Sequence, residues 1–497
     1  MRKQLLLVTI LIFFQLQLSI HAQDEKPTAQ QNSLNQSSAT NTQVKGIQGN
    51  WEGTLEAGGA KVRLVLKVTK KPDGTLTAAM DSPDQGATGI PLDYINFKDN
   101  TVTFELKAGG ALFEGTLNKE ETAIIGQWKQ GGGSFALTLN RTDKAPVILL
   151  RPQEPKKPFP YEEEEVSYEN KKAGVRLAGS LTLPRTKGPH PAVLLITGSG
   201  QQDRNEAMLG HKPFLVLADY LTRRGIAVLR VDDRGVGGST AGANPNNATS
   251  EDFAEDVLSG IEFLKSRKEI NSKKIGLIGH SEGGIIAPLV AAKSKDVAFI
   301  VLMAGPGLKA EEGFSVQVAS VAKVNGASDE SIAWNRKFMD QVFIILKQEK
   351  DNAVVQKRIA ETRTKMLSEL SEEQRKKLGV SENTSEGIVK LMTSPWFKFY
   401  LNYDPYATLK KVRVPVLAIV GERDLQVAPP KQNLAAIEKA LKAGGNKDFT
   451  TLELPKLNHL FQTSETGAPS EYGKIEETIS PTVLDLIANW IIKHTSN

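Results

Sequence analysis

The spacing of apolar residues changes along the chain and indicates two kinds of structure. From about residue 46 to residue 142, apolar residues recur at every second position, as with Val62, Leu64, Leu66 and Val68 in KVRLVLKVTK. Turn-forming stretches such as KPDG, KDN and GGG interrupt this alternation. The pattern predicts a small antiparallel barrel or sandwich, of about eight strands, over residues 46–143.

Beyond residue 160, short apolar strands alternate with helices. AVLLITG, AVLRVDD, KIGLIGH and AFIVLMAG are typical of buried strands, whereas Phe253, Val257, Ile261 and Leu264 recur at helical spacing. The series stops near Gly305 and resumes at VPVLAIVGERD. We therefore predict an α/β domain with a doubly wound parallel sheet over residues 161–497. A helical cap is expected at about 306–411, over the strand ends where ligands bind in such sheets.

Three further segments are assigned from composition. MRKQLLLVTILIFFQLQLSIHA has two basic residues, an apolar run and a small final residue, which predicts a signal peptide over residues 1–22. The alternative is a membrane anchor, but Gln15 and Gln17 make the apolar run short for a span. Residues 23–45 are rich in Gln, Asn, Ser and Thr and predict a disordered tether; residues 144–160 predict a Pro-rich linker. The expected location is the bacterial periplasm or the medium.

Charge and cysteine content restrict the possible partners and chemistry. The net charge is +5, and two of these charges belong to Arg2 and Lys3 in the predicted signal peptide. The remaining positive charge is too small to indicate nucleic acid as a partner. Apart from the N-terminal run, no segment is apolar enough to span a membrane. The absence of cysteine excludes disulfides, a thiol nucleophile and thiolate metal sites. We expect no metal or other cofactor, and the oligomeric state stays open.

The stretch GHSEG, residues 279–283, fits the G-x-S-x-G pattern of a nucleophile elbow. It lies between the predicted strand KIGLIGH and the predicted helix GIIAPLVAA. Such a turn exposes Ser281, and glycine at Gly279 and Gly283 avoids collisions with neighbouring backbone. The alternative is an ordinary strand–turn–helix with an incidental hydroxyl.

A serine needs a base and an oriented carboxylate to become a nucleophile. Of six histidines, His459 in LNHLFQ follows a predicted final strand and is the best candidate for the base, with His211 as the weaker alternative. Asp424 in GERD follows the preceding strand and is the candidate acid. Alone, these residues are equally well explained as a loop histidine and a helix cap. Their order Ser–Asp–His after successive strands favours a catalytic triad.

Two backbone N–H groups are candidates for the oxyanion hole that acyl transfer requires. One belongs to Glu282, directly after the candidate nucleophile, and the other to Ser199 in the glycine-rich TGSG turn. That turn lacks the GK[ST] ending of a phosphate-binding P-loop.

Aromatic residues in SPWFKFYLNY suggest one wall of a substrate pocket. Trp396, Phe397 and Tyr400 are the candidates, although core packing explains them equally well. In VDDRGVGGS, Asp232 and its neighbours are interpreted as bracing a loop. In the β-rich domain, aromatic residues are expected to fill the core more often than to line a ligand cavity.

The motifs TGSGQQDRN, VDDRGVGGST, GHSEGG, GERDLQV and LNHLFQ together resemble the α/β-hydrolase superfamily, and within it the bacterial EstD-type carboxylesterases. The resemblance covers about residues 160–497. It implies the α/β-hydrolase fold and places the nucleophile, acid and base at Ser281, Asp424 and His459. The β-rich residues 46–142 fit the extra N-terminal domain of that family. One departure is Thr197, where many hydrolases have His-Gly.

We therefore expect a cofactor-independent serine hydrolase that cleaves small-molecule carboxylic esters through an acyl-enzyme intermediate. A serine aminopeptidase-type peptidase is the alternative enzyme, with Glu282 as its one candidate for binding a substrate amine. A ligand-binding protein on a hydrolase scaffold is the alternative outside enzymes.

Overall fold

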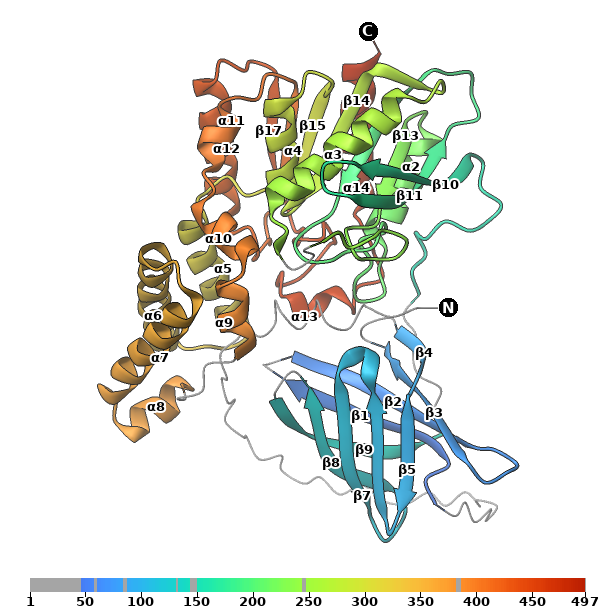
Figure 1. Cartoon of the computed structure of the whole chain (residues 1–497), viewed down its shortest axis with the longest axis vertical. Coiled ribbons are helices and arrows are strands. Elements are labelled where there is room, and N and C mark those ends of the chain that lie inside the picture. The colour runs from blue at the N-terminus through green and yellow to red at the C-terminus, as the bar shows by residue number, and fades with distance from the viewer. Residues whose placement is uncertain are drawn as a thin grey trace. The chain divides into compact units, whose positions relative to one another are not determined.

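The computed structural model describes residues 46–57, 60–83, 87–130, 133–143, 150–243, 247–380 and 386–496. These residues form two compact units, each described here by itself (Figure 1). The first contains residues 46–143 and 370–380, and the second contains residues 150–369 and 386–496. The predicted signal peptide and tether, and residues 144–149 of the predicted linker, lie outside the described residues.

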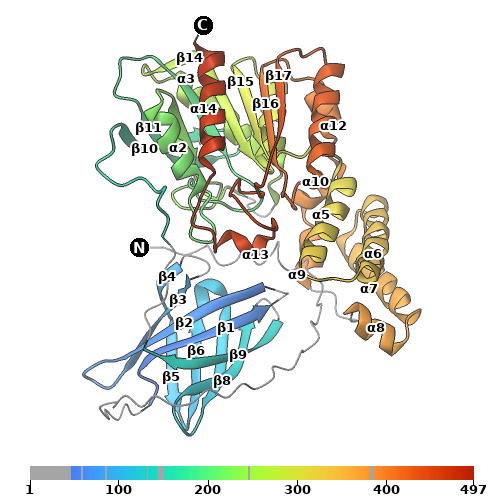
Figure 2. The ribbon, with the colours of Figure 1, turned by 180° about the vertical axis from the view of Figure 1, so that it is seen from behind.

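The first unit is built on one curled antiparallel sheet, visible in blue and teal in Figures 1 and 2. Its nine strands have the order β4-β3-β2-β1-β9-β8-β7-β6-β5. The strands are β1 (Gly49–Ala57), β2 (Ala60–Lys70), β3 (Leu76–Ser82), β4 (Ala87–Pro91), β5 (Tyr94–Lys98), β6 (Thr101–Leu106), β7 (Ala111–Leu117), β8 (Ala123–Gln130) and β9 (Gly133–Thr142), with the 3-10 helix η2 (Lys107–Gly109) between β6 and β7. The predicted barrel or sandwich is thus a single curled sheet.

Aromatic side chains fill the core of this sheet. Trp51, Phe104, Phe113 and Trp128 are all at most 2 % exposed and belong to one apolar cluster. The rings of Phe104 and Phe113 stack with their centroids 4.8 Å apart. Every second residue of β6 is buried, as the alternating sequence requires. Of the two explanations for these aromatic residues, the packing supports the core.

The second unit is built on a mostly parallel eight-stranded sheet with the order β10-β11-β13-β12-β14-β15-β16-β17. The strands are β10 (Glu162–Asn170), β11 (Val175–Leu183), β12 (His190–Ile196), β13 (Ala227–Val231), β14 (Ile270–His280), β15 (Phe299–Met303), β16 (Val416–Gly421) and β17 (Phe449–Leu454). β10 and β11 pair antiparallel and the strands from β13 to β17 pair parallel. Ile275, Leu277 and Ile278 of the central β14 are fully buried, as expected for a strand covered on both faces.

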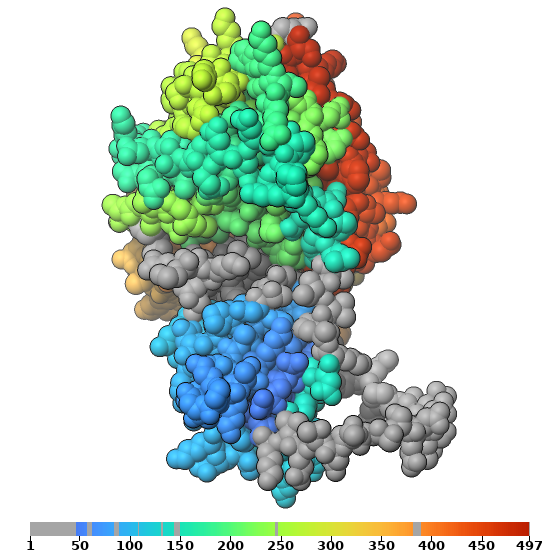
Figure 3. Space-filling model, turned by 90° about the vertical axis from the view of Figure 1, so that its right-hand side faces the viewer, coloured from blue at the N-terminus to red at the C-terminus, as the bar shows by residue number. Residues whose placement is uncertain are grey.

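Helices cover both faces of this sheet (Figures 1 and 2). α3, α4 and α12 pack into one apolar cluster, and α2 and α14 pack into the other. The bounds are α2 (Pro213–Arg223), α3 (Ser250–Lys265), α4 (Gly283–Lys293), α12 (Pro430–Ala443), α13 (Pro469–Tyr472) and α14 (Pro481–Thr495). In Figure 3, the surface of this unit that faces the viewer is formed by the teal to yellow-green segments, with the red C-terminal segments beside them.

Between β15 and β16 the chain is helical. These helices are α5 (Ala310–Val324), α6 (Asp329–Gln348), α7 (Asn352–Ser368), α8 (Glu372–Leu378), α9 (Glu386–Met392), α10 (Pro395–Asn402) and α11 (Pro405–Leu409). Across the described ranges, every helix is too short or too polar to cross a membrane.

Candidate active site

Ser281 lies on a tight turn between β14 and α4. Its φ is +52°, which lies in the left-handed region that residues other than glycine rarely adopt. A Cβ on Gly279 would lie 2.0 Å from the carbonyl oxygen of Gly283, and a Cβ on Gly283 would lie 2.3 Å from that of Ile196. Both positions therefore exclude larger residues, and the backbone conformation is that of a nucleophile elbow.

A cavity of about 50 Å³ opens beside this serine. Its wall contains Ser281 and the side chains of Trp396, Phe397 and Tyr400 from α10. The indole of Trp396 and the phenol of Tyr400 stack with an interplanar angle of 3°. The remaining lining residues are Ser199, Glu282, Ile285, Pro306, Phe314, Gln317, Leu391, Gln426 and Val427. Residues from the elbow, the TGSG turn and the segment between β15 and β16 thus meet at one site.

His459 and Asp424 form a buried pair. His459 Nδ1 lies 2.9 Å from Asp424 Oδ2, and the two residues are 4 % and 1 % exposed. Asp424 Oδ1 accepts hydrogen bonds from the N–H groups of Gln426 (2.8 Å) and Val427 (2.9 Å). Burial acts to raise the pKa of Asp424, but His459 and these N–H groups outweigh it, and the pKa lies below its usual value. Asp424 is therefore held as a carboxylate facing the ring of His459.

His280 connects Ser281 to the His459–Asp424 pair. The rings of His280 and His459 have centroids 4.8 Å apart, and Ser281 follows His280 in the chain. No hydrogen bond joins Ser281 Oγ to His459 within the residues that the structure describes. In enzymes without substrate, the hydrogen bond between nucleophile and base is commonly long, and it tightens only when substrate is bound.

The TGSG turn passes close to the candidate nucleophile. A Cβ on Gly198 would lie 3.3 Å from Ser281 Cβ. The Gly198 N–H donates to Glu206 Oε1 at 2.7 Å, so it is not free for a substrate oxygen. For the N–H groups of Ser199 and Glu282, the described part of the chain offers no acceptor. The two predicted oxyanion donors are thus unengaged at the cavity wall.

The Glu282 side chain is almost entirely buried and is bonded to two different helices. Its Oε1 accepts from Ser250 Oγ of α3 at 2.6 Å and from Trp396 Nε1 of α10 at 2.7 Å. Burial raises the pKa of this carboxyl group, and the hydrogen bonds from Ser250, Trp396 and Ser199 lower it only in part. The carboxyl group consequently links α10 to the elbow.

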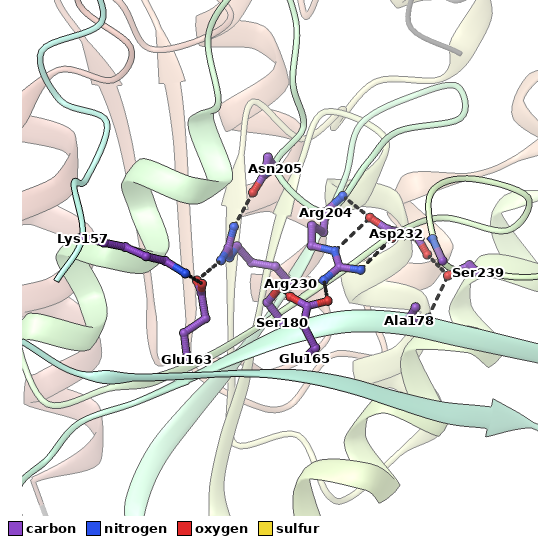
Figure 4. Close-up of polar contacts among 11 residues, drawn as sticks. Lys157, Glu163, Glu165, Ala178, Ser180, Arg204, Asn205, Arg230, Asp232 and Ser239 are labelled. Atoms are coloured by element: carbon purple, nitrogen blue, oxygen red, sulfur yellow. Dashed lines mark hydrogen bonds and ion pairs between the residues drawn. The ribbon is translucent and has the colours of Figure 1, made fainter. Parts of the chain in front are cut away.

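Figure 4 shows the ion pairs that support the segment after the TGSG turn. The guanidinium of Arg204 binds Asp232 through Nε (3.0 Å) and Nη2 (2.8 Å), and the Arg204 N–H also donates to Asp232 at 2.9 Å. Beside it, Arg230 donates to Asn205. These contacts hold the backbone that leads to Glu206.

The residues after β13 brace this region and do not enter the cavity beside Ser281. Asp233 accepts from Thr197 Oγ1 at 3.0 Å, and Arg234 donates to Asp256 Oδ1 at 2.9 Å. Together with the Asp232 contacts, these bonds agree with the interpretation of VDDRG as a loop brace.

Sequence patterns did not indicate the role of Glu206. This residue is 1 % exposed, has φ +51° and binds both Gly198 and the ring of His280. It follows Gly198 by eight residues and belongs to no motif, so only the folded loop brings it there. Among the described residues, no cluster of His, Asp or Glu has the arrangement of a metal site.

The comparisons with known proteins agree with this architecture. The family described as serine aminopeptidase, S33 matches residues 212–465, just over half of the chain. Esterase EstD of Thermotoga maritima is 28% identical over 330 residues, which are 66% of this chain and 68% of EstD.

Two solved hydrolases were also compared with this chain. The α/β hydrolase GrgF from Penicillium sp. sh18 is 15% identical, with a TM-score of 0.42, covering 68% of this chain and 100% of GrgF. The Pyrococcus furiosus esterase PF2001 is 16% identical, with a TM-score of 0.41, covering 67% of this chain and 91% of the esterase.

The fold and the elbow define a hydrolase of the α/β-hydrolase class, similar to EstD, and confirm the predicted fold class. The chain belongs to the serine aminopeptidase S33 family.

Proposed function

We propose that this protein is a carboxylesterase that uses Ser281 as its nucleophile, His459 as its base and Asp424 as the acid that orients the base. One observation carries the proposal. Ser281 occupies a left-handed turn in the wall of an aromatic-lined cavity, where the N–H groups of Ser199 and Glu282 have no acceptor among the described residues. A serine nucleophile and free N–H donors for the oxyanion are groups that acyl transfer requires.

In the proposed reaction, Ser281 Oγ bonds to the acyl carbon while its proton moves to His459 Nε2. The carbonyl electron pair moves onto oxygen, which accepts hydrogen bonds from Ser199 N–H and Glu282 N–H. Collapse of this intermediate expels the alcohol, which takes its proton from His459. Water then attacks the acyl carbon while its proton moves to His459 Nε2, and collapse of the second intermediate releases the acid as Ser281 Oγ takes that proton back.

The size of the cavity favours short acyl groups. Its volume is about 50 Å³, and the aromatic side chains of Trp396, Phe397 and Tyr400 lie in its wall. We therefore expect turnover of p-nitrophenyl esters to be greatest for acetate to butyrate and to fall towards laurate.

The contacts of Glu282 favour an esterase over an aminopeptidase. An aminopeptidase needs a carboxylate that can bind the substrate's amine. Glu282 is the candidate, but it is 4 % exposed and its Oε1 already accepts two hydrogen bonds.

The test compares p-nitrophenyl esters with aminoacyl-p-nitroanilides, with Ser281→Ala as the control. Ester turnover that falls roughly 10⁶-fold in Ser281→Ala supports the proposal. Turnover of anilides alone would favour the peptidase, and silence on both substrates in folded protein would favour a binding protein. That the protein acts outside the cytoplasm stays a prediction, which rests on the signal peptide predicted over residues 1–22.

A further inference from the structure

A second histidine–carboxylate contact lies beside the first. His280 Nδ1 is 2.9 Å from Glu206 Oε1, and His280 Nε2 is 3.0 Å from the carbonyl oxygen of His459. His280 is 4 % exposed and Glu206 is 1 % exposed. A carbonyl oxygen can only accept, and Glu206 Oε1 already acts as an acceptor for Gly198 N–H. His280 Nε2 therefore carries a proton, and Glu206 Oε1, as an acceptor, favours a proton on Nδ1 as well, so the geometry favours a contact between an imidazolium and a carboxylate.

This contact joins three segments that the proposed reaction needs. Glu206 fixes the turn that contains Ser199 by accepting from Gly198 at 2.7 Å. His280 is the residue before Ser281, and its Nε2–H fixes the backbone of His459 at 3.0 Å. A shift in any of the three segments would displace a donor, the nucleophile or the base.

The contact between His280 and Glu206 also affects the charge around the TGSG turn. Three carboxyl groups, those of the half-buried Asp233 and of the buried Glu206 and Glu282, surround the TGSG turn, and negative charge there would oppose a developing oxyanion. Burial raises the pKa of Asp233 well above its usual value and raises the pKa of Glu282, which favours their neutral forms. Burial alone would lower the pKa of His280, but Glu206, helped by the His459 carbonyl and Asp424, raises it.

We propose that Glu206 and His280 form a positioning ion pair for the hydrolase reaction. The pair holds the oxyanion turn and the backbone of His459 in register with Ser281, and the imidazolium cancels the carboxylate charge beside the oxyanion. This inference rests on the proposed function and adds a device that acts through Ser199, Ser281 and His459.

The kinetic test uses His280→Gln, Glu206→Gln and the double variant, with p-nitrophenyl acetate as substrate. His280→Gln leaves a buried carboxylate without its cation, so kcat should fall roughly 100-fold with little change in KM. In the double variant no charge is left uncompensated, and kcat should recover at least several-fold relative to His280→Gln. A purely structural role would instead make the double variant worse than either single variant, which would overturn the proposal.

His211→Gln is the matched control. His211 is also buried and uses both ring nitrogens, bonding Thr478 Oγ1 (3.0 Å) and the Tyr472 carbonyl (2.9 Å), but it does not contact the TGSG turn. We expect this variant to lose stability while kcat stays within about threefold of the wild type. Equal losses of kcat in His211→Gln and His280→Gln would overturn the proposal.

A second measurement needs no catalysis. In ¹⁵N-histidine NMR of the full chain at pH 8, the His280 resonances, assigned by their change in Glu206→Gln, should show a proton on both ring nitrogens. A single protonated nitrogen would overturn the ion pair even in an active enzyme. If the proposed function itself were wrong, the result would differ: the wild type would hydrolyse no ester, and a fluorophosphonate would not label Ser281.

Discussion

Two buried histidine–carboxylate pairs lie side by side in this molecule and differ in one respect. In His459–Asp424, the carboxylate binds Nδ1, and Nε2 has no partner among the described residues. In His280–Glu206, the carboxylate binds Nδ1 and a carbonyl oxygen binds Nε2. The ring centroids are only 4.8 Å apart.

Because of this difference, the same two residue types can take different roles. A histidine acts as a base only if one ring nitrogen is free to accept a proton. His459 keeps such a nitrogen, whereas both ring nitrogens of His280 are engaged by protein oxygen atoms. Neither burial nor the presence of a carboxylate distinguishes the two, and only the partner of the second nitrogen does.

The largest expected effect is on the pair that keeps a free nitrogen. Asp424→Asn preserves the shape of the side chain but removes the charge that orients the ring and stabilises the imidazolium. We expect kcat for p-nitrophenyl acetate to fall roughly 10⁴-fold, against a much smaller loss for Glu206→Gln. Equal losses in the two variants would mean that the pairs are not functionally distinct.

A smaller effect is expected from the support of the second pair. Arg204→Ala leaves Asp232 buried without its cation, so the free energy of unfolding should fall by about 3 kcal/mol. Chemical denaturation of the full chain measures this. Lys357→Ala is the control, because the Lys357–Glu361 pair is solvent-exposed and its loss should cost at most about 1 kcal/mol. Similar values for both variants would contradict the structural importance of the Arg204 contacts.

A third variant separates the cavity wall from the two pairs. Trp396→Phe keeps an aromatic ring but removes the indole N–H that donates to Glu282 at 2.7 Å. The loss of about 1 kcal/mol should raise KM roughly fivefold while kcat changes little. Trp334→Phe, in α6 and outside the cavity lining, should leave KM unchanged. A fall in kcat with constant KM in Trp396→Phe would refute this assignment.

The smallest expected effect is on the pH dependence of stability. Asp424 has a pKa below its usual value of 3.8, so its stabilisation is present above that pH and is lost as the pH falls through the lower folded value. Asp424→Asn should therefore flatten the loss of Tm below about pH 4.

Glu282 should behave in the opposite way. Its folded pKa lies above its usual value of 4.5, so its contribution is lost as the pH rises through the folded value. Relative to the wild type, Glu282→Gln should gain Tm between pH 4.5 and pH 8. Parallel Tm profiles for the wild type and this variant would contradict the expectation.

Local sequence was sufficient for the elements that depend on short-range spacing. The alternation around Phe104 predicted strands, and the strand–GHSEG–helix pattern predicted the turn at Ser281. The number of strands in the β unit and its single curled sheet were not predictable, because they depend on which strand edges pair.

The candidate site divides in the same way. Ser281, Asp424 and His459 could be selected from the sequence because each follows a strand, and parallel strands end at one edge of the sheet. Trp396 was ambiguous between pocket and core until α10 was placed beside the elbow.

The class of fold, the position of the elbow and the order of the candidate triad were predictable from the chain alone, since they follow from periodicity and from steric limits at Gly279 and Gly283. Three features became visible only in the folded chain: Gly198 N–H is occupied, Glu206 reaches His280, and His459 is the one of the two neighbouring histidines that keeps a free nitrogen. The physical reason is that hydrogen-bond partners distant in sequence are selected by packing, and spacing along the chain carries no record of them.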